Sequence, residues 1–238
     1  MTHEHSPDIA PVDFWEQRYA DADRVWSGRP NQTVVDVVST LAPGRALDLG
    51  CGEGADTIWL AEQGWDAVGL DISTTAITRA RRAAAASGVS RARFVSADLA
   101  TWDEDAVYDL VTASYLHSPV ALDRIGALRR AAARVAPRGR LLIVSHVAPP
   151  PWASPEHVRD HVFVQPADEL AALALDPAVW ATEIAEVRAR AITAPDGEPA
   201  TLDDGVVLLR RLHALPGDDT WLGNLAAGRA ADDRDPWA

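Results

Sequence analysis

The segment 46–55, ALDLGCGEGA, decides the fold, because an apolar run leads directly into a turn with glycine at every second position. The apolar run predicts a buried strand, and the residues after the turn predict a helix over 55–63. Glycine lets the backbone approach a ligand closely, and the first turn of a helix offers free N–H groups. The segment therefore predicts a ligand site at the carboxyl end of this strand.

Strands and helices alternate on both sides of this turn, and glycine or proline follows most of the expected helices. Units of this length predict a parallel sheet with helices on both faces and right-handed crossovers. The expected strands are 45–49, 66–70, 92–96, 108–113 and 141–145, and the expected helices are 11–20 capped by Asp13, one from residue 32, 55–63, 74–87 and 121–135.

The last third of the chain has a different pattern. A run of prolines interrupts the alternation, and a helix is expected over 167–175. Two long strands follow at 180–192 and 205–213, with the turn-forming pair Asp196-Gly197 between them. The expected fold is therefore an α/β sheet of seven strands, mostly parallel, that ends in an antiparallel hairpin. We divide the chain into an N-terminal segment (1–31), an α/β domain (32–213) and a C-terminal tail (214–238).

The composition excludes several classes of protein. Of the 238 residues, 35 are acidic and 22 basic, which gives a formal net charge of −13. This balance argues against a nucleic-acid partner, whose binding depends largely on basic residues, and disfavours an anionic membrane surface. The single cysteine, Cys51, excludes an internal disulfide and a cysteine-based zinc site. The chain has no long apolar run and no signal-peptide pattern, so we expect a cytoplasmic protein without a membrane span.

Acidic residues follow the first three expected strands. Asp48 lies at the end of the first strand, Asp71 ends the second and Asp98 follows the third. Carboxylates at these places attract a cation and accept hydrogen bonds from hydroxyl and amino groups, and Leu99 offers an apolar contact for a ring. They would repel a pyrophosphate. The three acids therefore favour an uncharged or cationic nucleoside as the ligand.

The glycine turn also permits a different ligand. Gly50, Gly52 and Ala55 match the loose dinucleotide fingerprint G-x-G-x-x-G/A, which leaves an NAD(P)-binding oxidoreductase as an alternative. Three features argue against it. Asp48 lies just before the first glycine, the glycines continue to Gly54, and the chain ends in a hairpin rather than in a second nucleotide-binding half.

Several segments resemble, in order and spacing, the motifs of class I S-adenosylmethionine-dependent methyltransferases. These segments are 46–61, 68–73, 96–99, 108–119 and 138–146. The N-terminal stretches FWEQRY and VWSGRPN resemble the tellurite-resistance and thiopurine/thiol methyltransferase branch of that class. The resemblance implies a seven-stranded Rossmann-like sheet and S-adenosylmethionine as the cofactor.

The resemblance also implies which residues surround the cofactor. The glycine turn and the acid before it would line the methionine part. The acids after the second and third strands, each with the residue that follows it, would meet the ribose and the adenine. Ser114 would lie beside the sulfonium, and Trp26 would help segment 1–31 to close over the pocket. The expected cofactor-binding residues are Trp26, Asp48, Gly50, Gly52, Gly54, Asp71, Ile72, Asp98, Leu99 and Ser114.

Such a site predicts transfer of a methyl group to a small-molecule nucleophile by in-line displacement, with the protein supplying proximity and alignment. A thiol or chalcogen acceptor needs only an environment that favours its anion, whereas a hydroxyl acceptor needs a base. His117 and His146 follow the fourth and fifth expected strands and are the catalytic candidates. His157 and His161 have the spacing of a helical metal pair, but no third ligand is evident, so we expect no metal. A binding module that keeps the cofactor pocket without an acceptor site is a second alternative.

Overall fold

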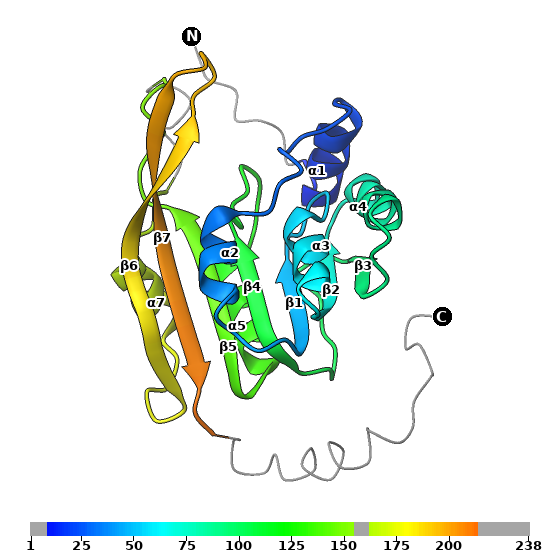
Figure 1. Cartoon of the computed structure of the whole chain (residues 1–238). Coiled ribbons are helices and arrows are strands. Elements are labelled where there is room, and N and C mark those ends of the chain that lie inside the picture. The colour runs from blue at the N-terminus through cyan, green and yellow to red at the C-terminus, as the bar shows by residue number, and fades with distance from the viewer. Residues whose placement is uncertain (1–8, 155–161, 214–238) are drawn as a thin grey trace.

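The computed structural model describes residues 9–154 and 162–213, which form one sheet with helices on both sides (Figure 1). The strands are β1 (Arg45–Leu49), β2 (Asp66–Asp71), β3 (Ala92–Ser96), β4 (Tyr108–Ser114), β5 (Val135–His146), β6 (Trp180–Thr193) and β7 (Pro199–Arg211). Their order in the sheet is β3-β2-β1-β4-β5-β7-β6. Strands β1 to β5 pair in parallel, and β7 runs antiparallel between β5 and β6. The predicted fold is confirmed, including its seven strands and its C-terminal hairpin.

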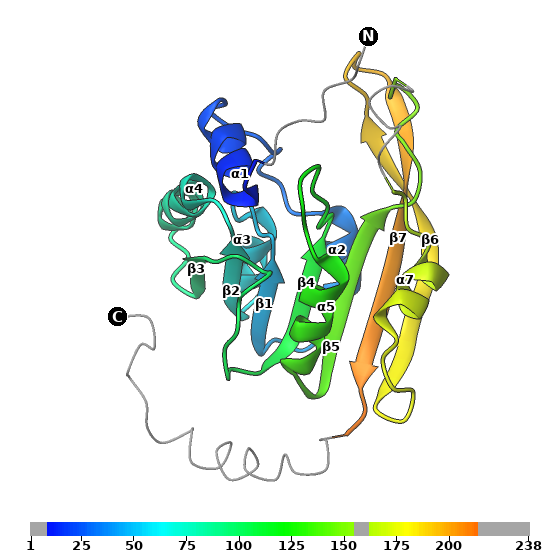
Figure 2. The same ribbon diagram turned by 180° about the vertical axis from the view of Figure 1, so that it is seen from behind.

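Three apolar clusters pack helices against the sheet. The helices are α1 (Pro11–Ala20), α2 (Gln32–Val38), α3 (Ala55–Glu62), α4 (Thr74–Ala86), α5 (Arg124–Ala133) and α7 (Pro166–Leu173). Helices α2 and α3 cover one face, and α5 and α7 cover the other (Figure 2). In β5, Leu141 and Ile143 belong to the core beneath α5, whereas Leu142 and Val144 belong to the core beneath α2. This alternation follows from the two-residue period of a strand that is buried on both faces.

Two elements in the middle of the chain differ from the prediction. Helix α5 begins at Arg124 rather than at 121, because Asp123 caps it by accepting a hydrogen bond from Gly126 N (3.0 Å). Strand β5 begins at Val135 rather than at 141. The segment 137–139, in which Arg138 has a φ of +69°, is an irregularity within the strand and not a turn between two elements. The sequence Pro-Arg-Gly is typical of a turn. The strand pairing that continues on both sides of it cannot be recognised from the local sequence.

The start of α1 also corrects the prediction. Asp13 was expected to cap this helix, but Ala10 occupies the capping position, and no side chain caps the first turn. Asp13 lies inside the first turn instead. The helix begins at Pro11 because proline is favoured at the first helical position, where it loses no hydrogen bond.

The C-terminal hairpin is longer than its sequence indicates. Gly197, with a φ of +92°, donates its N–H to Ala194 O (2.9 Å), and Ala194 N donates to Glu198 O (2.8 Å). This tight turn lets the two strands continue as far as Thr193 and Pro199, whereas the prediction started the last strand at 205. This part of β7 was not predicted as a strand because the segment 199–204 contains proline and polar residues.

The topology places the carboxyl ends of β1, β4 and β5 at one edge of the sheet. Leu49 of β1 pairs in register with Ala113 of β4, so the glycine turn lies beside the loop after β4. Because β7 is antiparallel to β5, Asp204 of β7 pairs with His146 at the end of β5. Among the described residues, no helix is long and apolar enough to cross a lipid bilayer.

Candidate functional site

The glycine turn after β1 has a backbone conformation that other residues rarely adopt. Gly50, Gly52 and Gly54 have φ values of +67°, +55° and +85°. The turn reaches across to β2, where Cys51 N donates to Leu70 O (2.8 Å). Gly54 is the residue before α3. The free N–H groups at the start of α3 therefore lie at the carboxyl edge of the sheet.

Asp71, at the end of β2, holds the turn in place. Its carboxylate is 8% exposed and accepts hydrogen bonds from Gly52 N (2.9 Å) and Ser73 N (2.9 Å). Burial raises the pKa of Asp71 above its usual range, although these backbone bonds act in the opposite direction. A carboxylate offers about four acceptor sites, so Asp71 retains capacity for the hydroxyl groups of a ribose. The ribose role stays a prediction.

Two further carboxylates lie close to the turn: Asp48 is buried and Asp56 is half-buried. Asp48 is 2% exposed and accepts hydrogen bonds from the hydroxyls of Thr57 (2.7 Å) and Thr112 (2.9 Å). Asp56, in the first turn of α3, accepts from Asn31 N (2.6 Å). Burial raises the pKa of both, and the charge of Asp56 raises the pKa of Asp48 further. Sequence reasoning missed Asp56, although an acid in the first turn of the helix after a glycine turn was the available signal.

Among the described residues, these three carboxylates have no cationic side chain as an ion-pair partner. Within residues 9–154 and 162–213, no arginine forms an ion pair with Asp48, Asp56 or Asp71, and the chain contains no lysine. Burial raises all three pKa values because the ionised form of each carboxyl group is poorly solvated here. A cationic ligand would compensate this charge, whereas a diphosphate would add to it. The residues present therefore fit a sulfonium nucleoside.

The remaining predicted cofactor residues have different surroundings. Ile72 is half-buried, and Asp98 is exposed and accepts from Ala100 N (2.8 Å) through its own carboxylate. Leu99 is 6% exposed and packs in the core beneath α5. The Ser114 hydroxyl is buried near Asp56 and, among the described residues, has no hydrogen bond of ordinary geometry. Their contacts with the cofactor stay predictions.

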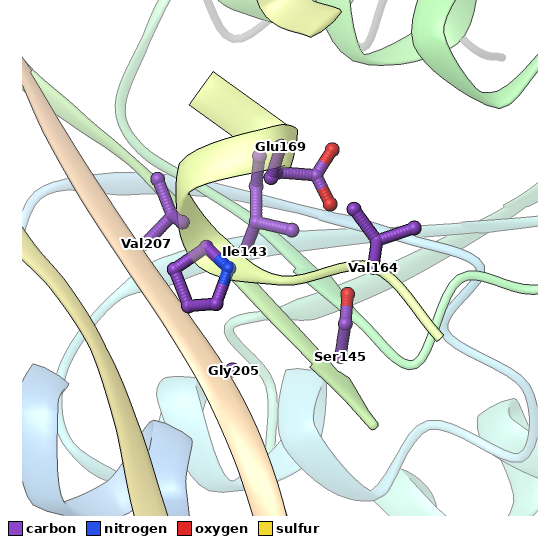
Figure 3. A pocket seen from close by; sticks show the side chains of 7 residues that line it. Ile143, Ser145, Val164, Glu169, Gly205 and Val207 are labelled. Carbon is purple, nitrogen blue, oxygen red and sulfur yellow. The ribbon is translucent and has the colours of Figure 1, made fainter. Parts of the chain in front are cut away.

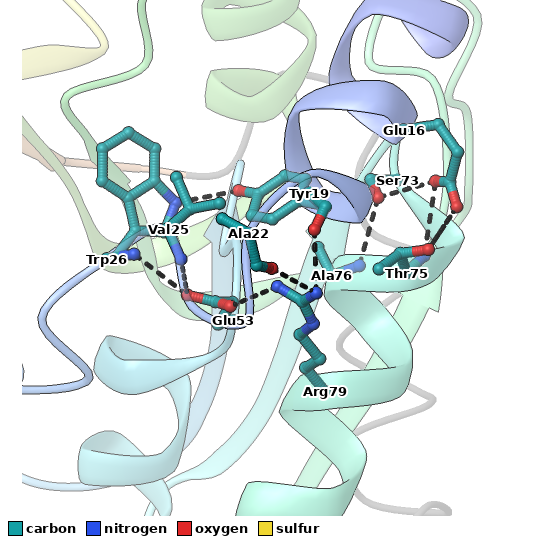
Figure 4. Close-up of polar contacts among 10 residues, drawn as sticks. All are labelled: Glu16, Tyr19, Ala22, Val25, Trp26, Glu53, Ser73, Thr75, Ala76 and Arg79. Carbon is teal, nitrogen blue, oxygen red and sulfur yellow. Dashed lines mark hydrogen bonds and ion pairs between the residues drawn. The ribbon is translucent and has the colours of Figure 1, made fainter.

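Residues 9–31 lie across this edge of the sheet, and we call them the covering segment (Figure 4). Glu16 of α1 accepts hydrogen bonds from the Ser73 hydroxyl (2.7 Å), from Thr75 N (3.2 Å) and from the Thr75 hydroxyl, at the start of α4. The start of a helix favours a negative charge. On the other side, Trp15 Nε1 donates to Ser118 Oγ (3.2 Å) in the loop after β4. The covering segment thus joins α4 to the β4 loop.

Arg79 of α4 supplies a second anchor. Its guanidinium pairs with Glu53 (3.0 Å) and donates to the carbonyl oxygens of Tyr19 (2.8 Å) and Ala22 (2.6 Å). Glu53, in the glycine turn, accepts from Trp26 N (3.0 Å) as well. The turn, α4 and the covering segment are therefore connected by one polar network (Figure 4). Sequence reasoning did not single out Glu16 or Arg79, because a charged residue on a helix is usually solvated.

Trp26 lies directly on the glycine turn. Its Nε1 donates to the Tyr19 hydroxyl (2.9 Å), and Tyr19 is 2% exposed. A Cβ atom at Gly52 would stand 3.0 Å from both Trp26 Nε1 and the Tyr19 hydroxyl. The absence of a side chain at Gly52 thus allows the covering segment to approach the turn. The prediction for Trp26 is compatible with this position, and Tyr19 was missed.

The two candidate catalytic histidines have different environments. His146 ends β5, and its side chain is 32% exposed. Its ring stacks on Tyr115, with centroids 4.1 Å apart and an interplanar angle of 20°, and its Nδ1 lies 3.4 Å from Asp204 Oδ1. His117 is half-buried after β4, and its backbone N–H donates to Tyr115 O (2.8 Å). The positions of His157 and His161 fall outside the described residues, within which no group of three or more His, Cys, Asp or Glu side chains could hold a metal ion.

A small hollow lies between β5, β7 and α7 (Figure 3). It leaves essentially no room for a water-sized sphere, whereas small-molecule sites typically enclose a few hundred Å³. Glu169 in its wall forms a buried ion pair with Arg124, whose guanidinium nitrogens lie 2.8 and 2.7 Å from the carboxylate oxygens. This ion pair joins α5 to α7, so we assign the residues around the hollow a structural role. It is lined by Ile143, Ser145, Val164, Pro166, Glu169, Gly205 and Val207.

Comparison with known proteins identifies the domain. Residues 46–139 match the family model described as a methyltransferase domain. "Probable thiol methyltransferase 2" of Arabidopsis thaliana is 34% identical over 101 residues, which are 41% of this chain and 45% of that protein. "Thiocyanate methyltransferase 1" of Brassica oleracea is 35% identical over 109 residues, which are 44% of this chain and 48% of that protein. The match thus spans about half the length of these curated relatives.

Two solved structures resemble most of the chain. One is described as "Conversion of a Disulfide Bond into a Thioacetal Group during Echinomycin Biosynthesis"; it is 26% identical, has a TM-score of 0.62 and covers 90% of this chain and 99% of that one. The other is the N-methyltransferase NodS from Bradyrhizobium japonicum WM9 in complex with S-adenosyl-L-homocysteine. It is 18% identical, has a TM-score of 0.62 and covers 85% of this chain and 100% of that one. At that identity, the likeness to NodS shows the fold alone.

The sheet, the glycine turn and the family match together define the class of protein. Residues 46–139 form a methyltransferase domain, and the fold is that of class I S-adenosylmethionine-dependent methyltransferases. Two of these relatives are named as thiol and thiocyanate methyltransferases, in agreement with the branch that the N-terminal motifs resemble. "Ribosomal RNA small subunit methyltransferase C" of Alcanivorax borkumensis is also 39% identical over 57 residues, 24% of this chain and 17% of that protein. The expected absence of a nucleic-acid partner therefore stays a prediction.

Proposed function

We propose that this protein transfers the methyl group of S-adenosylmethionine to a small sulfur nucleophile by in-line displacement. The observation that supports this proposal most directly is the group of acidic side chains around the glycine turn, whose ionised forms a nearby cation would stabilise. Asp48, Asp56 and Asp71 have raised pKa values, and no arginine of the described residues pairs with them. Such a site favours the sulfonium form of the cofactor over any anionic ligand.

The chain's own residues would mainly bind and align the reactants. The cofactor, when bound, supplies an activated methyl group on a cationic sulfur. Asp71 would hold the ribose hydroxyls, and the glycine turn would accept the methionine part. The covering segment would exclude water, since Tyr19 and Trp26 already lie against Gly52. Alignment of this kind can contribute about 7–11 kcal/mol to catalysis at best.

The relatives favour sulfur as the attacked atom. Two of them are named as thiol and thiocyanate methyltransferases, and the 26% identical structure is described by a reaction of a disulfide. A thiolate is a strong nucleophile and needs little more than a favourable environment. A hydroxyl acceptor is the second candidate, because it needs a base and His146 lies beside a carboxylate.

An oxidoreductase that binds NAD(P) is the alternative that shares the glycine turn. The sheet ends in β7 and β6, which are antiparallel, so the described residues contain no second nucleotide-binding half. The unpaired carboxylates also oppose a diphosphate. Both observations favour methyl transfer. They do not by themselves distinguish an enzyme from a binding module that lacks an acceptor site. The methylation assay makes that distinction.

The proposal is tested by incubating the purified protein with S-adenosylmethionine and a small acceptor. Mercaptoethanol, thiocyanate and phenol are the three acceptors, and mass spectrometry detects the methylated product. We expect S-methyl products and no anisole. Asp71→Asn should raise the KM for S-adenosylmethionine about 10- to 100-fold, the value of one hydrogen bond to a charged group. The control is Asp66→Asn, at the exposed start of β2. No product from either sulfur acceptor would overturn the proposal.

A further inference from the structure

Five polar side chains from four separate parts of the chain meet beside the end of β5, and we call them the Asp204 cluster. Asp204 of β7 has 0% exposure and lies at its centre. Its carboxylate accepts hydrogen bonds from the Thr33 hydroxyl (3.0 Å), the Tyr115 hydroxyl (2.8 Å) and Arg190 Nε (2.7 Å). The fifth member, His146, lies 3.4 Å from the other carboxylate oxygen through Nδ1. Neither relatives nor motifs assign a role to Asp204.

The cluster keeps a negative charge next to an imidazole. Burial alone would raise the pKa of Asp204, but hydrogen bonds from His146, Arg190 and Tyr115 outweigh it and lower the pKa to about 2. Asp204 is therefore ionised at every pH at which the protein would be assayed. A carboxylate beside Nδ1 favours the tautomer that carries its proton on Nδ1, which leaves Nε2 with a lone pair.

The position of His146 would allow a methyl acceptor to reach its Nε2 atom. Among the described residues, its Nε2 makes no hydrogen bond, and its side chain is 32% exposed. Its ring stacks on Tyr115, the residue directly after Ser114, which is expected beside the sulfonium. Leu116 of the same loop reaches the glycine turn, since a Cβ atom at Gly50 would stand 2.8 Å from its Cδ1. The β4 loop therefore connects the cofactor side to the Asp204 cluster.

The backbone of Tyr115 supports this connection. Tyr115 has a φ of +51°, which costs about 1 kcal/mol or more for a residue with a bulky side chain. The Tyr115 hydroxyl is held by Asp204, and its ring is held between His146 and the Arg190 guanidinium, 5.8 Å from the ring centroid. The strained conformation thus fixes the surface on which the imidazole stacks.

We infer that His146 and Asp204 form a general-base pair for acceptors that reach the site protonated, so that the substrate class includes neutral thiols and not only anions such as thiocyanate. His146 would act on the substrate, and Asp204 would be a positioning residue. This inference rests on the proposed function. It extends that function by naming a proton acceptor, a residue that positions it, and a difference in mechanism between neutral thiols and anionic sulfur substrates.

Methylation of a neutral thiol requires a proton transfer in addition to the methyl transfer. The thiol proton moves to His146 Nε2, and the sulfur lone pair forms a bond to the methyl carbon. The bond between that carbon and the sulfonium sulfur breaks, which leaves S-adenosylhomocysteine as a neutral thioether. The imidazolium, stabilised by Asp204, then loses its proton to water. Thiocyanate is already an anion, so its methylation requires no proton transfer.

The test compares both acceptors in the full-length protein. His146→Gln and Asp204→Asn should each lower kcat for mercaptoethanol about 10²-fold, the lower range for general-base catalysis, while kcat for thiocyanate stays almost unchanged. The loss should shrink as the pH approaches the pKa of the free thiol, because solvent then supplies the thiolate. The control is Glu183→Gln, which alters another carboxylate of the same hairpin, paired with Arg140 and Arg210 away from the cluster.

Nitrogen-15 spectra of the protein with S-adenosylhomocysteine give a readout besides activity. His146→Gln assigns the signal, which should show the proton on Nδ1. In Asp204→Asn the tautomers should mix, because an amide donates as well as accepts. Equal losses for both acceptors, or an unchanged tautomer, would mean that Asp204 is only structural. If the wild type methylates thiocyanate but not the thiol, this inference fails and the proposed function stands. If it methylates neither acceptor, the proposed function itself is wrong.

Discussion

Replacing Arg79 by methionine tests whether the covering segment is held down by one guanidinium. The substitution keeps most of the aliphatic stem and removes three polar contacts: the pair with Glu53 and the bonds to the carbonyl oxygens of Tyr19 and Ala22. Both carbonyls belong to the covering segment. The energetic cost should therefore fall on the docking of residues 9–31 and not on the core of the sheet.

The size of the effect follows from these contacts. Hydrogen bonds to charged groups contribute about 1.5–3 kcal/mol each, and the lower value applies because the Arg79 side chain is 24% exposed. The partly exposed pair with Glu53 adds about 0.5 kcal/mol at most. The total is about 3 kcal/mol, which corresponds to a population of the undocked segment about 10²-fold larger.

Hydrogen exchange followed by mass spectrometry measures this change. Peptides from α1 should exchange about 10²-fold faster in Arg79→Met, while peptides from β4 and β5 keep their wild-type rates. The matched control is Arg91→Met, whose ion pair with Asp66 has both side chains 58% exposed and should matter little. Wild-type exchange in α1, or equal acceleration in the core strands, would show that Arg79 does not hold the covering segment in place.

Three further outcomes are expected. Burial raises the pKa of Asp48 and Asp56, so binding of the cationic cofactor should release protons. The protein's affinity for S-adenosylmethionine should then rise with pH above about 4, and it should rise more than the affinity for S-adenosylhomocysteine. Calorimetry in different buffers measures the proton release, and proton uptake would contradict this expectation. Glu169→Gln should lower the unfolding free energy in urea by about 3–5 kcal/mol, and a loss below about 1 kcal/mol would show that the ion pair contributes little. Gly52→Ala, at a φ of +55°, should lower the melting temperature through a strain of about 1–2 kcal/mol, and an unchanged melting curve would exclude that strain.

Much of the fold could be predicted because its signals are local. The strand β1 and the start of α3 follow directly from the apolar run and glycine turn of 46–55. Ser73 caps α4 as the sequence indicates, by accepting a hydrogen bond from Ala76 N (3.1 Å). The hairpin was recognised from Asp196-Gly197. In each case, neighbouring residues determine both the conformation and the pattern.

The candidate site was predicted only in part, because several of its contacts join distant residues. The Asp204 cluster joins Thr33 to Asp204 across 171 positions and Tyr115 to Asp204 across 89. No local pattern distinguishes Asp204 from Asp203 before it. Arg79 likewise resembles the other arginines of α4, and only packing of the covering segment gives it three partners.

Titration calorimetry with two ligands shows whether the acidic side chains around the glycine turn select a cationic ligand. The wild-type protein is titrated with S-adenosylmethionine and, separately, with NADH under the same conditions. We predict micromolar binding of S-adenosylmethionine and no heat from NADH, because buried carboxylates around the turn accept a cation and reject a diphosphate. Binding of NADH without binding of S-adenosylmethionine would contradict the account.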